Sequence, residues 1–136
     1  MRSLFAFVLL MCSTLVWASD APKAAAAPRA VVTVLNTYTL PEYPGKEALM
    51  ILVEYPPGSV DPVHRHKAHA FIYVIEGSIV MGLNGGKSVT LSAGQTYHEG
   101  PTDLHSTGRN ASTSKPARFV VTLIKDIGAP VLIPAP

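Results

Sequence analysis

The chain has 136 residues, of which 48% are hydrophobic and 15% are charged. This composition is sufficient for the hydrophobic core of one domain and excludes a disordered acidic segment. The formal net charge is only +2, and the basic residues are scattered along the chain. We therefore expect no nucleic-acid partner, because such an interface needs clustered lysines and arginines.

Residues 1–18 are typical of a secretory signal peptide, with a positive start, an apolar run and the cleavage site Val16-Trp17-Ala18. The apolar run is shorter than the ~20 residues that span a bilayer, so we expect no stable membrane anchor. Export to the periplasm or the cell exterior is the expected location. Cleavage after Ala18 would remove Cys12, the only cysteine. Any metal would then be bound by nitrogen and oxygen.

Residues 19–30 are rich in alanine and proline and are predicted to form a linker, followed by one domain over residues 31–136. Short runs of β-branched and aromatic residues within this domain predict strands, and the Gly, Pro and Asn residues between them predict turns. The predicted strands are Val31–Leu35, Ala48–Tyr55, Ala70–Ile75, Ser78–Leu83, Ser88–Leu91 and Arg118–Ile124. Asn84-Gly85 predicts a hairpin. The domain shows no convincing helical period, so its fold class is predicted to be all-β, a sandwich or a closed barrel.

Two histidines, His64 and His66, are separated by one residue and precede the predicted strand Ala70–Ile75. Side chains two positions apart on an extended strand point to the same face, so both imidazoles would be directed at one point. Neutral imidazole is a favoured ligand of divalent transition metals. A third histidine, His105, lies near the far end of the chain.

Two sequence motifs around these histidines resemble those of the cupin superfamily. Gly58, five residues, His64-Arg65-His66 and then Phe71–Gly77 resemble its first motif, and Gly94–Pro101 followed by His105 and Asn110 resembles its second. The resemblance covers about residues 45–125 and is to the small single-domain, RmlC-like cupins. It implies a small antiparallel β-barrel of the jelly-roll type.

The resemblance also implies a metal site with His64, His66 and His105 as ligands. The cupin motif usually has a fourth ligand, a Glu, where this chain has Ala70, and a methyl group cannot bind metal. Some cupin dioxygenases use three histidines alone, which leaves coordination positions open for substrate and oxygen. One divalent ion is implied, and Fe, Mn, Ni, Co and Zn all suit three imidazoles.

Three further residues near the motifs are candidates for a supporting or substrate-binding role. Strand parity directs His69 away from His64 and His66, unless a local bulge reverses it. His98 and Glu99 flank the second motif, and Glu99 could orient a ligand histidine by accepting its other ring N–H. A solvent-facing loop is an equal alternative for both.

Asn110 also begins the sequence Asn110-Ala111-Ser112, which has the form of a glycosylation sequon. Because Asn110 falls within the second cupin motif, we expect its side chain to fix backbone instead.

The sequence is compatible with two functions of different class. The first is a metal-dependent enzyme, a dioxygenase or a lyase/isomerase, acting on a small organic molecule. The second is a non-enzymatic module that binds or senses a metal or small ligand. The resemblance to small cupins and the apolar run Val31–Leu35, a candidate sheet edge, further predict a homodimer.

Overall fold

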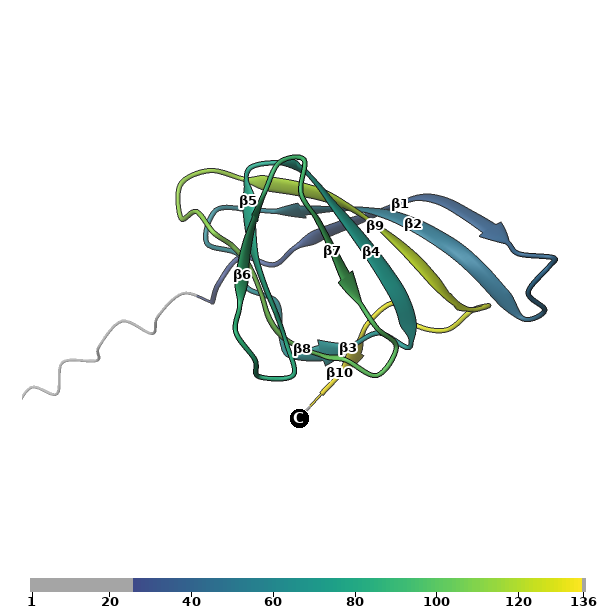
Figure 1. The fold of residues 1–136 in the computed structure, drawn as a ribbon. Helices are drawn as coiled ribbons and strands as arrows, with labels where there is room; N and C mark the ends of the chain where they lie inside the picture. The colour runs from purple at the N-terminus through teal and green to yellow at the C-terminus, as the bar shows by residue number, and fades with distance from the viewer. Residues whose placement is uncertain (1–25, 136) are drawn as a thin grey trace, which may run out of the picture.

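The structure is a computed structural model that describes residues 26–135, so the predicted signal peptide lies outside the described residues. Within residues 26–135, ten strands form two antiparallel five-stranded sheets (Figure 1). The first sheet has the order β1-β2-β9-β4-β7 and the second β10-β3-β8-β5-β6. The strands are β1 (Val31–Thr39), β2 (Lys46–Tyr55), β3 (His64–Arg65), β4 (Ala68–Glu76), β5 (Ser78–Leu83), β6 (Val89–Ser92), β7 (Thr96–Glu99), β8 (Leu104–Asn110), β9 (Ala117–Asp126) and β10 (Ile133–Pro134).

The predicted all-β, antiparallel fold class is confirmed for the part of the chain that the structure describes. Each of the six predicted runs lies largely within a strand, namely β1, β2, β4, β5, β6 and β9. The short strands β3, β7, β8 and β10 were not predicted, because polar residues and turn formers interrupt any alternation there. Residues 26–135 contain no helix long and apolar enough to cross a membrane.

The predicted hairpin at Asn84-Gly85 joins β5 to β6, which pair in antiparallel register. Asn84 and Gly85 both have positive φ angles, 55° and 69°. The Gly86 N–H donates to the Leu83 carbonyl across 2.9 Å, which closes a tight turn around them. Two successive positive φ angles define the turn type whose twist suits a two-stranded hairpin, so the prediction from this dipeptide is confirmed.

One face of the first sheet packs inward and the other faces outward. Along β4 and β9, buried residues alternate with more exposed ones, as the period of two in a strand requires. The inner face contains Ala70, Val74 and Leu123, each fully buried. We call the side that packs inward the inner face and the opposite side the outer face.

The side chain of Asn110 holds three backbone segments together at the end of β8. Its amide nitrogen lies 3.1 Å from the carbonyl oxygens of Tyr55 and Pro56 and 2.8 Å from that of Lys115. Its amide oxygen accepts the Ser112 N–H at 2.9 Å. The residue is only 3% exposed. These contacts support the backbone-fixing interpretation of Asn110 over the sequon.

The C-terminal segment, residues 129–135, returns to β3, the strand that bears His64 and is followed by His66. β10 pairs with β3, and the Ala135 N–H donates to the Val63 carbonyl. At the start of this segment, the buried Lys125 ammonium donates to the Ala129 carbonyl at 2.7 Å. The end of the chain is therefore part of the framework around the histidines.

Candidate metal centre

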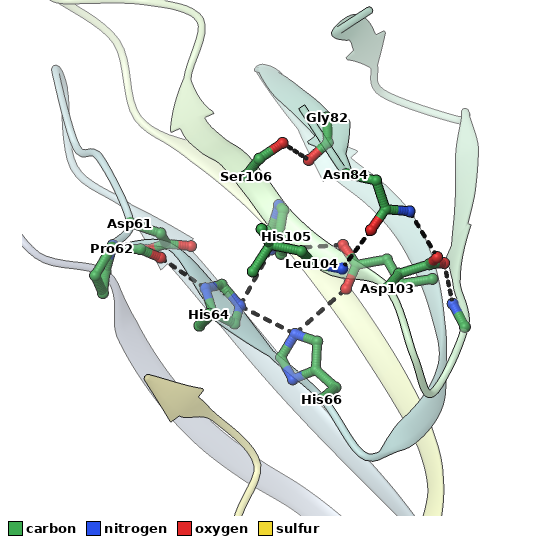
Figure 2. A network of polar contacts seen from close by, with 12 residues as sticks. Asp61, Pro62, His64, His66, Gly82, Asn84, Asp103, Leu104, His105 and Ser106 are labelled. Atoms are coloured by element: carbon green, nitrogen blue, oxygen red, sulfur yellow. Dashed lines mark hydrogen bonds and ion pairs between the residues drawn. The ribbon is translucent and has the colours of Figure 1, made fainter. Parts of the chain in front are cut away.

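His64, His66 and His105 meet at one point on the inside of the second sheet (Figure 2). His64 on β3 and His105 on β8 are direct register partners, and His66 follows β3. One ring nitrogen from each histidine lies within 4.8 Å of the others. His64 and His105 are buried, at 3% and 5% exposure. The structure thus brings together all three histidines that the sequence singled out.

The spacing of the ring nitrogens fits a common metal ion. His64 Nε2 lies 3.1 Å from His66 Nε2 and 3.1 Å from His105 Nδ1. Two ligands at ~2.1 Å from one ion and at right angles to each other would be ~3.0 Å apart. Three nitrogen donors at this spacing suit Fe, Mn, Co, Ni or Zn, so the residues present fit the metal that the sequence predicts.

Backbone carbonyl groups hold two of the imidazole rings in place. His64 Nδ1–H donates to the Pro62 carbonyl at 2.7 Å, and His66 Nδ1–H donates to the Val131 carbonyl. Each bond uses the Nδ1 side of the ring and directs Nε2 at the site. Sequence reasoning missed both partners, because a carbonyl group carries no side-chain signature and Val131 is distant in sequence.

His105 is held by close packing instead. A Cβ atom on Gly108 would come within 2.9 Å of His105 Cε1 and 3.2 Å of Asp61 Oδ2, so only glycine leaves room for this ring position. The Nε2 atom of His105 is buried without a hydrogen-bond partner among the described residues. Asp61 itself accepts a hydrogen bond from the Tyr55 hydroxyl.

Glu99 on β7 is buried, at 3% exposure, beside the three histidines. Its carboxylate oxygens lie 3.3 Å from His66 Nε2 and 3.6 Å from His105 Nδ1. These are the same ring nitrogens that face the site, rather than the opposite nitrogens of the rings. The sequence predicted Glu99 as a candidate supporting residue of the site. The structure places its carboxylate beside the ring nitrogens that converge there.

Burial and the Glu99 carboxylate shift the pKa values of the histidines in opposite directions. Burial lowers the pKa of His64, which favours the neutral form that binds metal. Burial also disfavours charge on His66, but its hydrogen bonds to Glu99 and Val131 raise its pKa above the usual value. Burial alone would raise the pKa of Glu99, whereas the hydrogen bond with His66 and the nearby His105 hold it below its usual value. Glu99 is therefore ionised at neutral pH.

A cavity of about 820 Å³ adjoins the histidines between the two sheets. Its wall is mainly apolar and includes Ile51, Val53, Ile72, Phe119, Val121 and Leu123. The three histidines and Glu99 also line it. A pocket of this size, with an apolar wall and a few converging polar groups, is typical of a small-molecule site.

His69 and His98 lie on the outer face, away from the other three histidines. His69 Nδ1 is 3.1 Å from His98 Nε2, and the two rings stack with their centroids 5.4 Å apart. Both side chains are exposed, and Phe71 packs against His98. The structure therefore pairs these two residues with each other and keeps them on the solvent side of the sheet.

Comparison with known proteins gives a family and a fold. A model of the Cupin domain family matches residues 51–123, more than half of the chain. No curated protein matches. Among solved structures, a conserved protein with a double-stranded β-helix domain from Klebsiella pneumoniae is 16% identical with a TM-score of 0.62, covering 90% of this chain and 100% of that one.

Two enzymes of known structure share the fold. The DMSP lyase DddQ from Ruegeria pomeroyi is 18% identical with a TM-score of 0.57, covering 65% of this chain and 43% of the lyase. An oxalate oxidase in complex with glycolate is 23% identical with a TM-score of 0.59, covering 77% of this chain and 54% of the oxidase. This chain thus spans about half the length of each enzyme, and these likenesses describe the fold alone.

Proposed function

Since this chain belongs to the cupin family, we propose that it binds one divalent metal ion through His64, His66 and His105 and uses it to act on a small organic molecule. The observation that carries this proposal is the convergence of three imidazole nitrogens, two of them 3.1 Å from the third, beside a cavity of about 820 Å³. A cavity large enough for a small molecule and a candidate metal centre therefore adjoin each other.

The bound metal would supply Lewis-acid or oxygen-activating chemistry, and the protein would supply the ligands and the enclosure. His64 and His66 are oriented by the carbonyls of Pro62 and Val131, so little reorganisation is needed to bind the ion. The apolar wall would hold the hydrocarbon part of a substrate and exclude water from the reacting group. A dioxygenase and a lyase or isomerase both match this arrangement.

A second candidate is a non-enzymatic module that binds or senses a metal or small ligand. The observation in its favour is Ala70, which occupies the position of the usual cupin Glu and so removes one candidate general base. The alternatives differ in whether the bound metal supports turnover.

Elemental analysis of the protein beside a His64→Ala, His105→Ala double variant tests the metal site. We expect close to one equivalent of metal in the wild type and none in the variant. Absence of metal from the wild type, even after reconstitution, would overturn the proposal.

The enzyme alternative is tested with small molecules that combine an apolar body with paired oxygen donors, such as catechols, 1,3-diketones and short α-keto acids. Turnover that is lost on chelation and returns with one particular metal would identify an enzyme. Stoichiometric metal without turnover of any of them would favour the binding module.

We also propose that the protein is exported and forms a homodimer. The export proposal rests on residues 1–18. β1 supports the dimer, because it is the end strand of its sheet and all nine of its residues are exposed. Light scattering at micromolar concentration should give twice the chain mass, and a monomer mass would contradict this proposal.

A further inference from the structure

Glu99 and Ala70 face each other across two neighbouring strands. They are direct register partners in the antiparallel pair β4–β7, and both lie on the buried inner face. Side chains at paired positions of adjacent strands have Cβ atoms only about 4.5–5.5 Å apart. A carboxylate attached at position 99 can therefore reach the same space as one attached at position 70.

The position of the Glu99 carboxylate distinguishes a ligand from an orienting group. A carboxylate that orients a metal-bound histidine accepts the N–H of the ring nitrogen remote from the metal. In His66 that remote nitrogen, Nδ1, is already bonded to the Val131 carbonyl. Glu99 instead contacts His66 Nε2 and His105 Nδ1, the two atoms directed at the centre of the site.

We propose that Glu99 is the fourth metal ligand and that β7 supplies the carboxylate that the cupin motif normally places on β4. This inference rests on the proposed metal site. Its distances support it: the contacts of 3.3 and 3.6 Å to the two ring nitrogens are close to the 3.1 Å spacing between the nitrogens themselves. The donor set is then three imidazole nitrogens and one carboxylate oxygen. The site would thus have four protein ligands although position 70 is an alanine.

A role as metal ligand would also account for the burial of the Glu99 carboxylate on the inner face. Burying a carboxylate without a partner is costly, and carboxylates at such positions are paired or bind metal. With neutral histidines as metal ligands, the positive charge opposite Glu99 would come from the ion. The fourth ligand would thus be stabilised by the same ion that it binds.

A titration of the metal-free protein with Co²⁺ tests the inference, using calorimetry for affinity and the visible absorption of Co²⁺ for the ligand set. The variants are Glu99→Gln, which keeps the shape of the side chain, and the double variant Ala70→Glu, Glu99→Ala, which moves the carboxylate to β4. The matched control is Glu54→Gln, which changes a half-exposed Glu on the same sheet.

We expect Glu99→Gln to weaken Co²⁺ binding by at least about 10–100-fold, the effect of losing even a supporting partner, and to change the Co²⁺ spectrum. The Ala70→Glu, Glu99→Ala variant should recover most of the affinity, and Glu54→Gln should leave it unchanged. Wild-type affinity and spectrum in Glu99→Gln would overturn the inference while leaving the three-histidine site intact.

The two proposals fail in different ways. Absence of Co²⁺ binding by the wild type would overturn the metal site itself, whereas binding that ignores Glu99 overturns only its role as a ligand. If the double variant does not fold, as judged by circular dichroism, the Glu99→Gln titration and its spectrum still decide the question.

Discussion

Histidines lie on both sides of the sheet β1-β2-β9-β4-β7, in different surroundings. The three histidines of the candidate metal centre adjoin the inner face, and the pair His69 and His98 lies on the outer face. A nitrogen-to-nitrogen distance of 3.1 Å occurs in both groups. Close histidines alone therefore do not distinguish a metal centre from a surface pair.

The surroundings of the two groups supply that distinction. On the inner side, backbone carbonyls fix the rings, a buried carboxylate faces them and a cavity adjoins them. On the outer face, the pair is exposed and packs beside Phe71. A phenylalanine and an ion pair can also be matched between the two faces. Substitutions at these positions test whether the inner face is the structurally important one.

The largest expected effect is a loss of metal binding when a histidine of the metal centre is replaced, but not when a histidine of the outer face is replaced. His105→Ala should weaken binding of Co²⁺ by more than about 100-fold, because the loss of a ligand exceeds the 10–100-fold effect of losing a supporting partner. His98→Ala should change the affinity less than about 2-fold, since the side chain lies on the opposite face. Calorimetric titration of both variants measures the contrast, and an equal loss in the two would contradict it.

The second expected contrast is in stability. Phe119 is 3% exposed and packs edge-on against Tyr55 with ring centroids 4.9 Å apart, whereas Phe71 is 52% exposed. Phe119→Ala should reduce the free energy of unfolding by ~3–5 kcal/mol, as for other buried aromatic residues. Phe71→Ala should cost less than ~1 kcal/mol. Urea unfolding at pH 7 measures both, and a large loss from Phe71→Ala would show that the outer face is covered in solution.

Much of this arrangement follows from the sequence, because strong local patterns determine it. Runs of β-branched and aromatic residues predicted the long strands, and the His64-x-His66 spacing predicted that these two imidazoles point to one site. The resemblance of the second motif to cupins supplied His105. The hairpin was predictable because Asn84-Gly85 tolerates two positive φ angles.

The role of Glu99 was not predictable to the same degree, because it depends on register. In a strand as short as β7, His98 and Glu99 point to opposite faces, and only the pairing with β4 decides which one is buried. The positions of the Pro62 and Val131 carbonyl groups, which orient His64 and His66, depend on the path of the backbone. No local sequence pattern encodes the meeting of Val131 with His66, which lie 65 residues apart.

The smallest expected contrast involves two of the three ion pairs between β2 and β9. Glu47 and Lys125 are register partners on the inner face, with the ammonium 2.5 Å from the carboxylate, and side-chain exposures of 11% and 4%. Glu54 and Arg118 are register partners on the outer face at 3.2 Å, and both are 43% exposed. A buried pair that loses one partner leaves an uncompensated charge, whereas solvent screens an exposed one.

Lys125→Met should therefore lower the unfolding midpoint by at least about 5 °C, and Arg118→Met by about 1 °C or less. The hydrogen bond from Lys125 lowers the pKa of Glu47, so the contribution of this pair is present above the ordinary carboxyl pKa and is lost as the pH falls through the lowered value. The difference between wild type and Lys125→Met should consequently narrow in acid. Thermal melts between about pH 3 and pH 7 follow this trend, and a difference that is constant with pH would show that packing of the Lys125 stem, rather than its charge, stabilises the inner face.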